Sequence, residues 1–297
     1  MYTLLRLVFI ALLLALLGGG VFWVLTRPGH VDSTAYDGLT GDAERGKWVF
    51  DAGGCASCHS APGASGEEKL TLAGGKSFAS DFGTFLAPNI SPDPQAGIGA
   101  WSLLDLANAM QRGVSPEGRH YYPAFPYTAY IHAAPQDIAD LWAYLQTLPP
   151  SDSPSQPHQV GFPFSISRGV GLWKMLYLAD DFTLASPDEE VLRGRILVEA
   201  LGHCAECHTP RNALGGLEKD LWLTGAQLAG GAGRAPGLTP DHLDWSEEEI
   251  AEYLSSGFTP DFDSAGGEMT DVVENTAKLS QADRLAIAAY LKALPTP

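Results

Sequence analysis

The sequence predicts an all-α protein in which two tandem copies of one helical domain follow an N-terminal membrane-spanning helix. Three observations predict this: an uncharged apolar run at the N-terminus, an internal repeat, and one Cys-x-x-Cys-His motif in each copy. We expect five segments: a transmembrane anchor at 1–27, a linker at 28–40, a first domain at 41–150, an inter-domain strap at 151–186 and a second domain at 187–297.

The N-terminal apolar run covers residues 7–25 and contains no charged side chain. At ~1.5 Å rise per residue, a helix over this run nearly spans the ~30 Å hydrocarbon core of a bilayer. Arg6 and Arg27 flank the run, and Trp23 would lie near one membrane interface. A cleaved signal peptide is the alternative, with Gly18 and Gly20 as the small residues before the cut. The apolar residues that follow these glycines favour an uncleaved anchor.

The composition narrows the classes of function. The 35 acidic and 18 basic side chains give a net charge of −17, which argues against a nucleic-acid partner. Such an acidic body could dock on a basic patch of a partner, although the charge could also serve solubility alone. All four cysteines lie inside the two motifs, so no cysteine is left for a structural disulfide or a catalytic thiol.

The repeat consists of ordered matches at nearly constant offset. Residues 101–113 (WSLLDLANAMQRG) recur as 245–257 (WSEEEIAEYLSSG), and residues 137–149 (DIADLWAYLQTLP) recur as 283–295 (DRLAIAAYLKALP). An Ala-Pro pair also recurs between these segments and the motifs. We attribute the small drifts in offset to short insertions and deletions in loops. The pattern indicates two copies of one fold.

Each copy has the signals of several helices. Ser102 and Ser246 stand at N-cap positions, with acidic residues in the following turn. Apolar residues between 138 and 148 have helical spacing, and Pro149-Pro150 ends that helix.

A helix is also expected just before each motif, and each of these contains a glycine. Gly46 and Gly194 would cost their helices about 1 kcal/mol relative to alanine. A close helix crossing would explain them, with Tyr144 and Tyr290 as the partners across it. Between the copies, the strap is rich in Pro and Ser at first and then aromatic. We expect it to pack on the second copy; an interfacial membrane contact is the alternative.

The Cys-x-x-Cys-His motif has a specific chemistry. Two thiols one helical turn apart can add to the two vinyl groups of a haem, and the adjacent histidine then binds the iron as the proximal ligand. A zinc site would need further ligands, and a redox-active dithiol would sit in a βαβ context. The motifs therefore predict two covalently bound haem c groups in class I cytochrome c-like domains. The thioethers would form at Cys55, Cys58, Cys204 and Cys207, and the proximal ligands would be His59 and His208.

The sixth iron ligand differs between the copies. Met269 is the only methionine after the second motif and lies in a Gly-rich segment before the last helix, so we expect it to be the distal ligand of haem 2. Copy one has no methionine in the equivalent region. Its candidates are His132, just before the last helix, then His120 in an expected solvent-facing turn, and Met110, which as a helix residue is more typical of core packing. We favour His132, and an open iron is the alternative.

Several segments resemble the cytochrome c subunits of membrane-bound bacterial alcohol, gluconate and aldehyde dehydrogenases. The similarity starts near Gly41 and is carried by Arg45-Gly46, by residues 86–93 (LAPNISPD), 97–102 (GIGAWS) and 122–127 (YPAFPY), and by the stretch from Gly202 to Asn212 around the second motif. The resemblance implies that the carbonyls of Pro88 and Pro236 orient the proximal histidines, and it also implies that Met269 is the distal ligand.

This chain departs from that family in two respects. The family usually has three haem motifs, whereas two are present here. It also has a Lys-Met pair before the last helix of the first domain, where this sequence has His132-Ala133.

Electron transfer is the function that these features favour. Haem attachment outside the cytoplasm would place the domains in the periplasm of a bacterium, held by one pass through the inner membrane. The protein would relay electrons from a periplasmic dehydrogenase or another respiratory donor to a downstream acceptor. A terminal oxidase or another cytochrome could be the partner in a larger membrane complex, and the chain would have no catalytic activity of its own. A peroxidase-like dihaem enzyme with an open haem 1 is the alternative, and a sensing module is a third.

Overall fold

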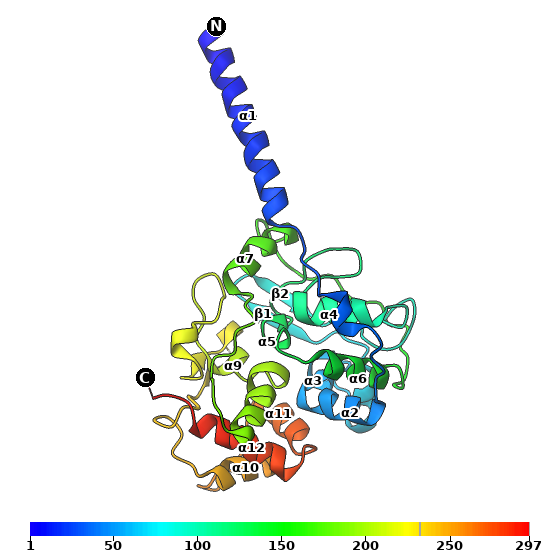
Figure 1. The fold of residues 1–297 in the computed structure, drawn as a ribbon, viewed down its shortest axis with the longest axis vertical. Coiled ribbons are helices and arrows are strands. Elements are labelled where there is room, and N and C mark those ends of the chain that lie inside the picture. The colour runs from blue at the N-terminus through cyan, green and yellow to red at the C-terminus, as the bar shows by residue number, and fades with distance from the viewer. Residues whose placement is uncertain (232, 297) are drawn as a thin grey trace.

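A computed structural model describes residues 1–231 and 233–296. Helix α1 (Tyr2–Leu25) extends alone from a helical body, and none of its residues is buried (Figure 1). Its length and apolar composition are sufficient to cross a membrane. A 3-10 turn, η1 (Ser33–Tyr36), then leads into the first domain.

The first domain contains both helices and a small hairpin. Its elements in chain order are α2 (Ala43–Ala52), α3 (Cys55–His59), η2 (Gly66–Thr71), β1 (Ser77–Ser80), β2 (Gly83–Leu86), α4 (Leu103–Arg112), α5 (Tyr127–Tyr130) and α6 (Pro135–Leu145).

The strap and the second domain follow. The strap contains η3 (Ser167–Gly169) and α7 (Val170–Tyr177). The second domain contains α8 (Glu189–Arg195), the π-helix η4 (Ile196–Leu201), α9 (Ala205–His208), η5 (Lys219–Leu221), β3 (Ala226–Gln227), η6 (Ala229–Gly231), β4 (Arg234–Ala235), α10 (Glu247–Ser256), α11 (Met269–Thr276) and α12 (Gln281–Lys292).

The all-α expectation therefore holds only in part. Each domain has an antiparallel hairpin after its motif, with Ser77 opposite Leu86 in one and Ala226 opposite Ala235 in the other. The first hairpin ends just before the shared Ala-Pro pair, and the second ends on the alanine of that pair. The second domain otherwise repeats the helix order of the first, and the buried side chains of both form one continuous cluster.

The predicted glycine crossings are present in both copies. A Cβ atom built on Gly46 would overlap the backbone carbonyl of Asp140 and lie 2.7 Å from the Cβ of Tyr144. Gly194 faces Ala286 and Tyr290 in the same way, again with 2.7 Å to the tyrosine Cβ. The absence of a side chain lets α2 pack against α6, and α8 against α12, at backbone contact.

The predicted N-caps are also confirmed. Ser102 accepts a hydrogen bond from the amide of Asp105 at 3.2 Å, and the Asp105 carboxylate accepts one from the Ser102 amide at 2.8 Å. Ser246 and Glu249 form the same capping box on α10. These caps satisfy amides that the first helical turn leaves without a partner.

One change in the sequence offset between the two copies lies inside a helix, although we expected these changes to lie in loops. Domain 2 has one more residue between Gly194 and Cys204 than domain 1 has between Gly46 and Cys55. The structure accommodates it inside the helix, as the π-helix Ile196–Leu201. The motif thus keeps its place at the end of the helix despite the insertion.

The strap contacts both domains rather than the second alone. In its first part, Ser151 and Ser153 accept hydrogen bonds from the Asn89 side chain, each at 2.8 Å, and these contacts are with domain 1. In α7, Lys174 donates to the Gly113 carbonyl of domain 1 at 2.7 Å, while the Trp173 indole donates to a domain 2 carbonyl. The strap therefore packs on both domains, and not on the second domain alone as expected.

Candidate haem sites

The first motif is a single helical turn, α3. Gly54 precedes it in the left-handed region, with φ of 60°, and so directs the chain into this turn. Nδ1 of His59 lies 2.9 Å from the Pro88 carbonyl oxygen. Because that carbonyl can only accept, Nδ1 carries the proton and Nε2 is left free for a metal. Burial lowers the pKa of His59, which favours the neutral imidazole that metal binding needs.

The second motif repeats this geometry. Nδ1 of His208 lies 2.8 Å from the Pro236 carbonyl oxygen, and burial lowers the pKa of this histidine as well. In both copies the histidine carbonyl accepts a hydrogen bond from a glycine amide, Gly74 at 2.7 Å and Gly225 at 2.8 Å. The sequence resemblance implied the two proline contacts, and the structure contains both.

The thiols fit covalent attachment better than a bare metal ion. All four cysteines are free, and burial raises the pKa of Cys55 and of Cys204 to about 12. Among residues 1–231 and 233–296, no three His, Cys, Asp or Glu side chains converge as a metal-ion site. Each motif therefore offers two reduced thiols beside one oriented imidazole, and this is the donor set that a c-type haem requires.

The two motifs lie next to each other across the domain boundary. A Cβ atom on Gly53 would be 3.8 Å from the Leu201 carbonyl oxygen, and one on Gly202 would be 3.7 Å from the Ala52 carbonyl oxygen. The ring centroids of Tyr130 and the His203 side chain, the residue before Cys204, are 5.7 Å apart.

Charged side chains of domain 2 also lie close to the first motif. Burial raises the pKa of Cys58 to about 11; the charge of Lys76 opposes this rise, while Glu268, Asp271 and Cys207 of domain 2 add to it. The backbone segments that would hold the two haems are thus in contact.

Helix α11 joins the two sites. Met269, its first residue, is half-buried at its N-terminal end. Further along, the Asn275 amide donates to the Ser57 hydroxyl inside the first motif at 2.7 Å. Lys76 of domain 1 forms ion pairs with Glu268 at 2.8 Å and with Asp271 at 3.3 Å. The helix that carries the expected ligand of haem 2 is therefore fixed to the motif of haem 1.

His132 lies at the junction of domain 1 with the strap. Its ring stacks on Phe182, with 4.5 Å between centroids and 25° between planes, and its buried Nδ1 has no hydrogen-bond partner among the residues that the structure describes. Burial lowers its pKa. The neighbouring Ala133 is the side chain that enters the domain core, at 3% exposure. The His132 ring thus packs on the strap, while the adjacent side chain of Ala133 faces the core.

The two other candidates in domain 1 have clear positions. Met110 is buried in the core cluster. The expectation that His120 faces solvent is wrong: its side chain is 6% exposed, Nε2 lies 2.9 Å from the Thr26 carbonyl oxygen, and Nδ1 lies 3.1 Å from Nζ of Lys174. His120 thus joins the end of α1 to the strap.

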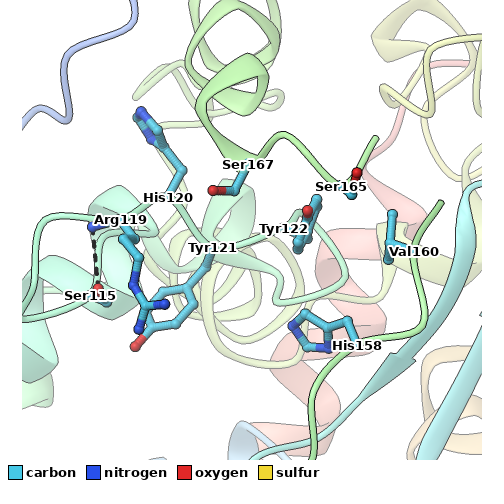
Figure 2. A pocket seen from close by; sticks show the side chains of 9 residues that line it. All are labelled: Ser115, Arg119, His120, Tyr121, Tyr122, His158, Val160, Ser165 and Ser167. Carbon is cyan, nitrogen blue, oxygen red and sulfur yellow. Dashed lines mark hydrogen bonds between the residues drawn. The ribbon is translucent and has the colours of Figure 1, made fainter. Parts of the chain in front are cut away.

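A pocket of about 370 Å³ lies beside His120, between domain 1 and the strap (Figure 2). In that view, Tyr122 of domain 1 and His158 of the strap lie next to each other, with 5.6 Å between their ring centroids. Sequence reasoning missed both this pocket and the contacts of Lys76 and Asn275, because no spacing pattern connects residues so far apart in the chain.

The comparisons with known proteins agree with this geometry. The cytochrome c family profile matches twice, over residues 43–149 and 191–295. A "Diheme cytochrome c-type" protein of Cereibacter sphaeroides is 56% identical over 96% of this chain and 96% of its own length. The fructose dehydrogenase cytochrome subunit of Gluconobacter japonicus is 35% identical over 84% of the chain. The gluconate 2-dehydrogenase cytochrome c subunit of Pantoea cypripedii is 36% identical over 92% of the chain. The matched regions are 52% and 64%, respectively, of these last two proteins.

Proposed function

Since this chain belongs to the cytochrome c family and has two c-type haem domains, we propose that it is an electron relay between a periplasmic dehydrogenase and a downstream acceptor. When bound, each haem supplies a reversible one-electron change at its iron. The chain's own residues hold the haems, orient their axial ligands and set the distance between them.

One observation carries the proposal: the two motif segments touch across a domain boundary that is fixed on several sides. The backbone approaches of Gly53 and Gly202 bring the segments together, and the hydrogen bond from Asn275 to Ser57 holds the second domain against the first motif. A fixed short separation is what an internal electron transfer between the two haems needs.

Each proposed site residue has a role in this relay. We assign thioether formation to Cys55, Cys58, Cys204 and Cys207, and proximal ligation to His59 and His208. The Pro88 and Pro236 carbonyls fix the tautomer and the direction of the proximal rings. Met269 is assigned as the distal ligand of haem 2.

The proposed distal ligand of haem 1 is His132. A second imidazole donates more strongly to Fe(III) than a thioether does, so haem 1 would have the lower potential. Electrons would then move downhill from haem 1 to haem 2. An open haem 1 is the alternative, because the His132 ring packs on Phe182 of the strap and Ala133 is the neighbouring side chain that faces the core.

The partner and the location are part of the proposal. Two of the relatives are named as cytochrome subunits of fructose dehydrogenase and of gluconate 2-dehydrogenase, which supports a dehydrogenase as electron donor. Helix α1 supports a single membrane pass, with the haem domains on the periplasmic side of the bacterial inner membrane. We propose that the chain works there as part of a larger membrane complex.

The test is low-temperature EPR with near-infrared magnetic circular dichroism on the oxidised holoprotein and on His132→Ala. The relay predicts one His/Met and one bis-His low-spin haem, and loss of the bis-His signals in the variant. Phe262→Ala, at an exposed position in domain 2, is the matched control and should leave both spectra unchanged. A wild-type high-spin haem that binds peroxide or carbon monoxide would instead support the peroxidase-like enzyme and reject the His132 assignment.

A further inference from the structure

Exposed apolar side chains are concentrated in the second half of the strap. Six large apolar residues between 162 and 176 are exposed, four of them by more than half of their surface. We call this set the strap face; it consists of Phe162, Phe164, Ile166, Leu172, Met175 and Leu176. Exposed apolar groups gathered in this way mark a contact surface, unlike single exposed residues.

The segment that carries the strap face contacts the C-terminal end of α1. Arg168 donates to the Trp23 carbonyl at 2.7 Å and to the Thr26 hydroxyl at 2.9 Å, and its guanidinium lies 4.1 Å from the centre of the Trp23 ring. A Cβ atom on Gly171 would lie 2.7 Å from that of Thr26. Figure 1 shows α7 at the base of α1, on the side of the body from which the anchor emerges.

This junction is rigid rather than a loose tether. Thr26 is fully buried, and its carbonyl lies 2.9 Å from Nε2 of His120. The other nitrogen of His120 lies 3.1 Å from Nζ of Lys174, which also donates to the Gly113 carbonyl at 2.7 Å. The end of α1, the strap and domain 1 are thereby held together. The position of the strap face along the axis of the anchor is therefore fixed.

The charge of this segment differs from that of the rest of the chain. No acidic side chain occurs between Asp152 and Asp180, although the chain has 35 acidic residues and a net charge of −17. Arg27 and Arg168 lie at the boundary between the anchor and the strap. An anionic lipid surface attracts such basic groups and repels acidic ones. The strap can therefore approach a lipid surface without the repulsion that acidic side chains would cause.

From these four observations we propose that the strap face lies in the interface of the lipid bilayer, beside the exit point of α1. The proposal rests on α1 being the membrane anchor, as proposed above. Apolar side chains of an interfacial segment typically enter ~5–10 Å into the boundary between headgroups and acyl chains. The contact fixes the tilt of the haem domains, because α1 and the strap face together give the body two points of attachment.

The experiment measures the depth of spin labels in the full-length holoprotein. Ile166→Cys and Met175→Cys test the strap face, Leu16→Cys tests α1, and Phe262→Cys, 95% exposed in domain 2, is the aqueous control. The haem thioethers consume the native thiols, so each variant takes up one label. The protein is placed in vesicles of phosphatidylcholine with a minority of phosphatidylglycerol. Oxygen and a water-soluble nickel chelate then serve as the two relaxing reagents, and the haem spectrum confirms folding of each variant.

The proposal predicts that labels at 166 and 175 are more accessible to oxygen than to the chelate, as at position 16, and that position 262 shows the reverse. If position 16 reports lipid while 166 and 175 report water, the strap face is not interfacial although the anchor stands. Shielding of 166 and 175 from both reagents would mean a protein contact and would also overturn the proposal. Water at position 16 itself would reject the anchor, and with it this inference.

Discussion

Single side chains decide the chemistry of each haem site, and here the residue types in the sequence were informative. The two histidines could be predicted from the motifs, and their contacts with the proline carbonyls were implied by the family resemblance. His120 could not be placed, because its partners Thr26 and Lys174 come from distant segments that meet only in the fold.

Met269 gives the first prediction at this scale. Replacing it by alanine should lower the potential of haem 2 by on the order of 0.2 V, a part of the ~0.8 V range that axial ligands cover. A thioether stabilises Fe(II), and a water or vacant position does so less. Redox titration followed by the haem absorbance would measure the change.

Met110→Leu, a buried volume-conserving change in domain 1, is the control for that titration. Equal potentials in Met269→Ala and wild type would show that another group binds the iron of haem 2.

The elements follow local rules that the sequence displays, with two exceptions. Capping boxes and glycine crossings could be predicted because their partners are a few residues apart or repeat in both copies. The hairpins could not, because strands of four and two residues are too short to show an alternating pattern. The π-helix had a signal, the single residue gained between Gly194 and Cys204, but an insertion alone does not say whether it enters a helix or a loop.

The glycine crossings support a stability prediction. Gly46→Ala and Gly194→Ala should each lower the free energy of unfolding by about 2–3 kcal/mol, because the added methyl group would overlap a carbonyl of the opposite helix. Thermal unfolding of the holoprotein, monitored by circular dichroism, would measure the loss. Gly29→Ala, which meets no atom within 4 Å, should be neutral. Equal stability of all three variants would contradict the tight crossing.

At the scale of the whole molecule, the important feature is the interface between the domains, which no single-copy pattern indicates. The Trp48 indole of domain 1 donates to the Asp283 carboxylate of domain 2 at 3.0 Å, and Arg193 donates to the same carboxylate at 2.7 Å. The Arg193 guanidinium also lies 4.3 Å from the Trp48 ring centre. The sequence predicted two domains but not which of their faces meet.

Asp283 makes this interface sensitive to pH. Burial alone would raise the pKa of its carboxyl, but hydrogen bonds from Trp48, Arg193 and Ser280 outweigh burial and hold the pKa below 3.8. A lowered pKa means that the ionised form stabilises the fold above the unfolded value, and that this contribution is lost as the pH falls through the folded value.

Asp283→Asn should therefore be less stable than wild type at neutral pH, by about 2 kcal/mol for a hydrogen-bonded charge, and this difference should shrink below pH 3.8. Unfolding by denaturant at a series of pH values would measure the difference. Asp37→Asn, at an exposed position before the first domain, is the control. A difference that is the same at all pH values would show that the charge of Asp283 does not stabilise the interface.

The contact between the two motif segments has a consequence for biogenesis. In the folded chain, Cys55, Cys58 and Cys204 are partly buried beside the joint of the two domains, whereas Cys207 is exposed. An enzyme that ligates haem therefore has poorer access to the first three thiols once the joint has closed. Attachment of both cofactors while the halves are still apart would avoid this obstruction, and docking of the halves would then complete maturation.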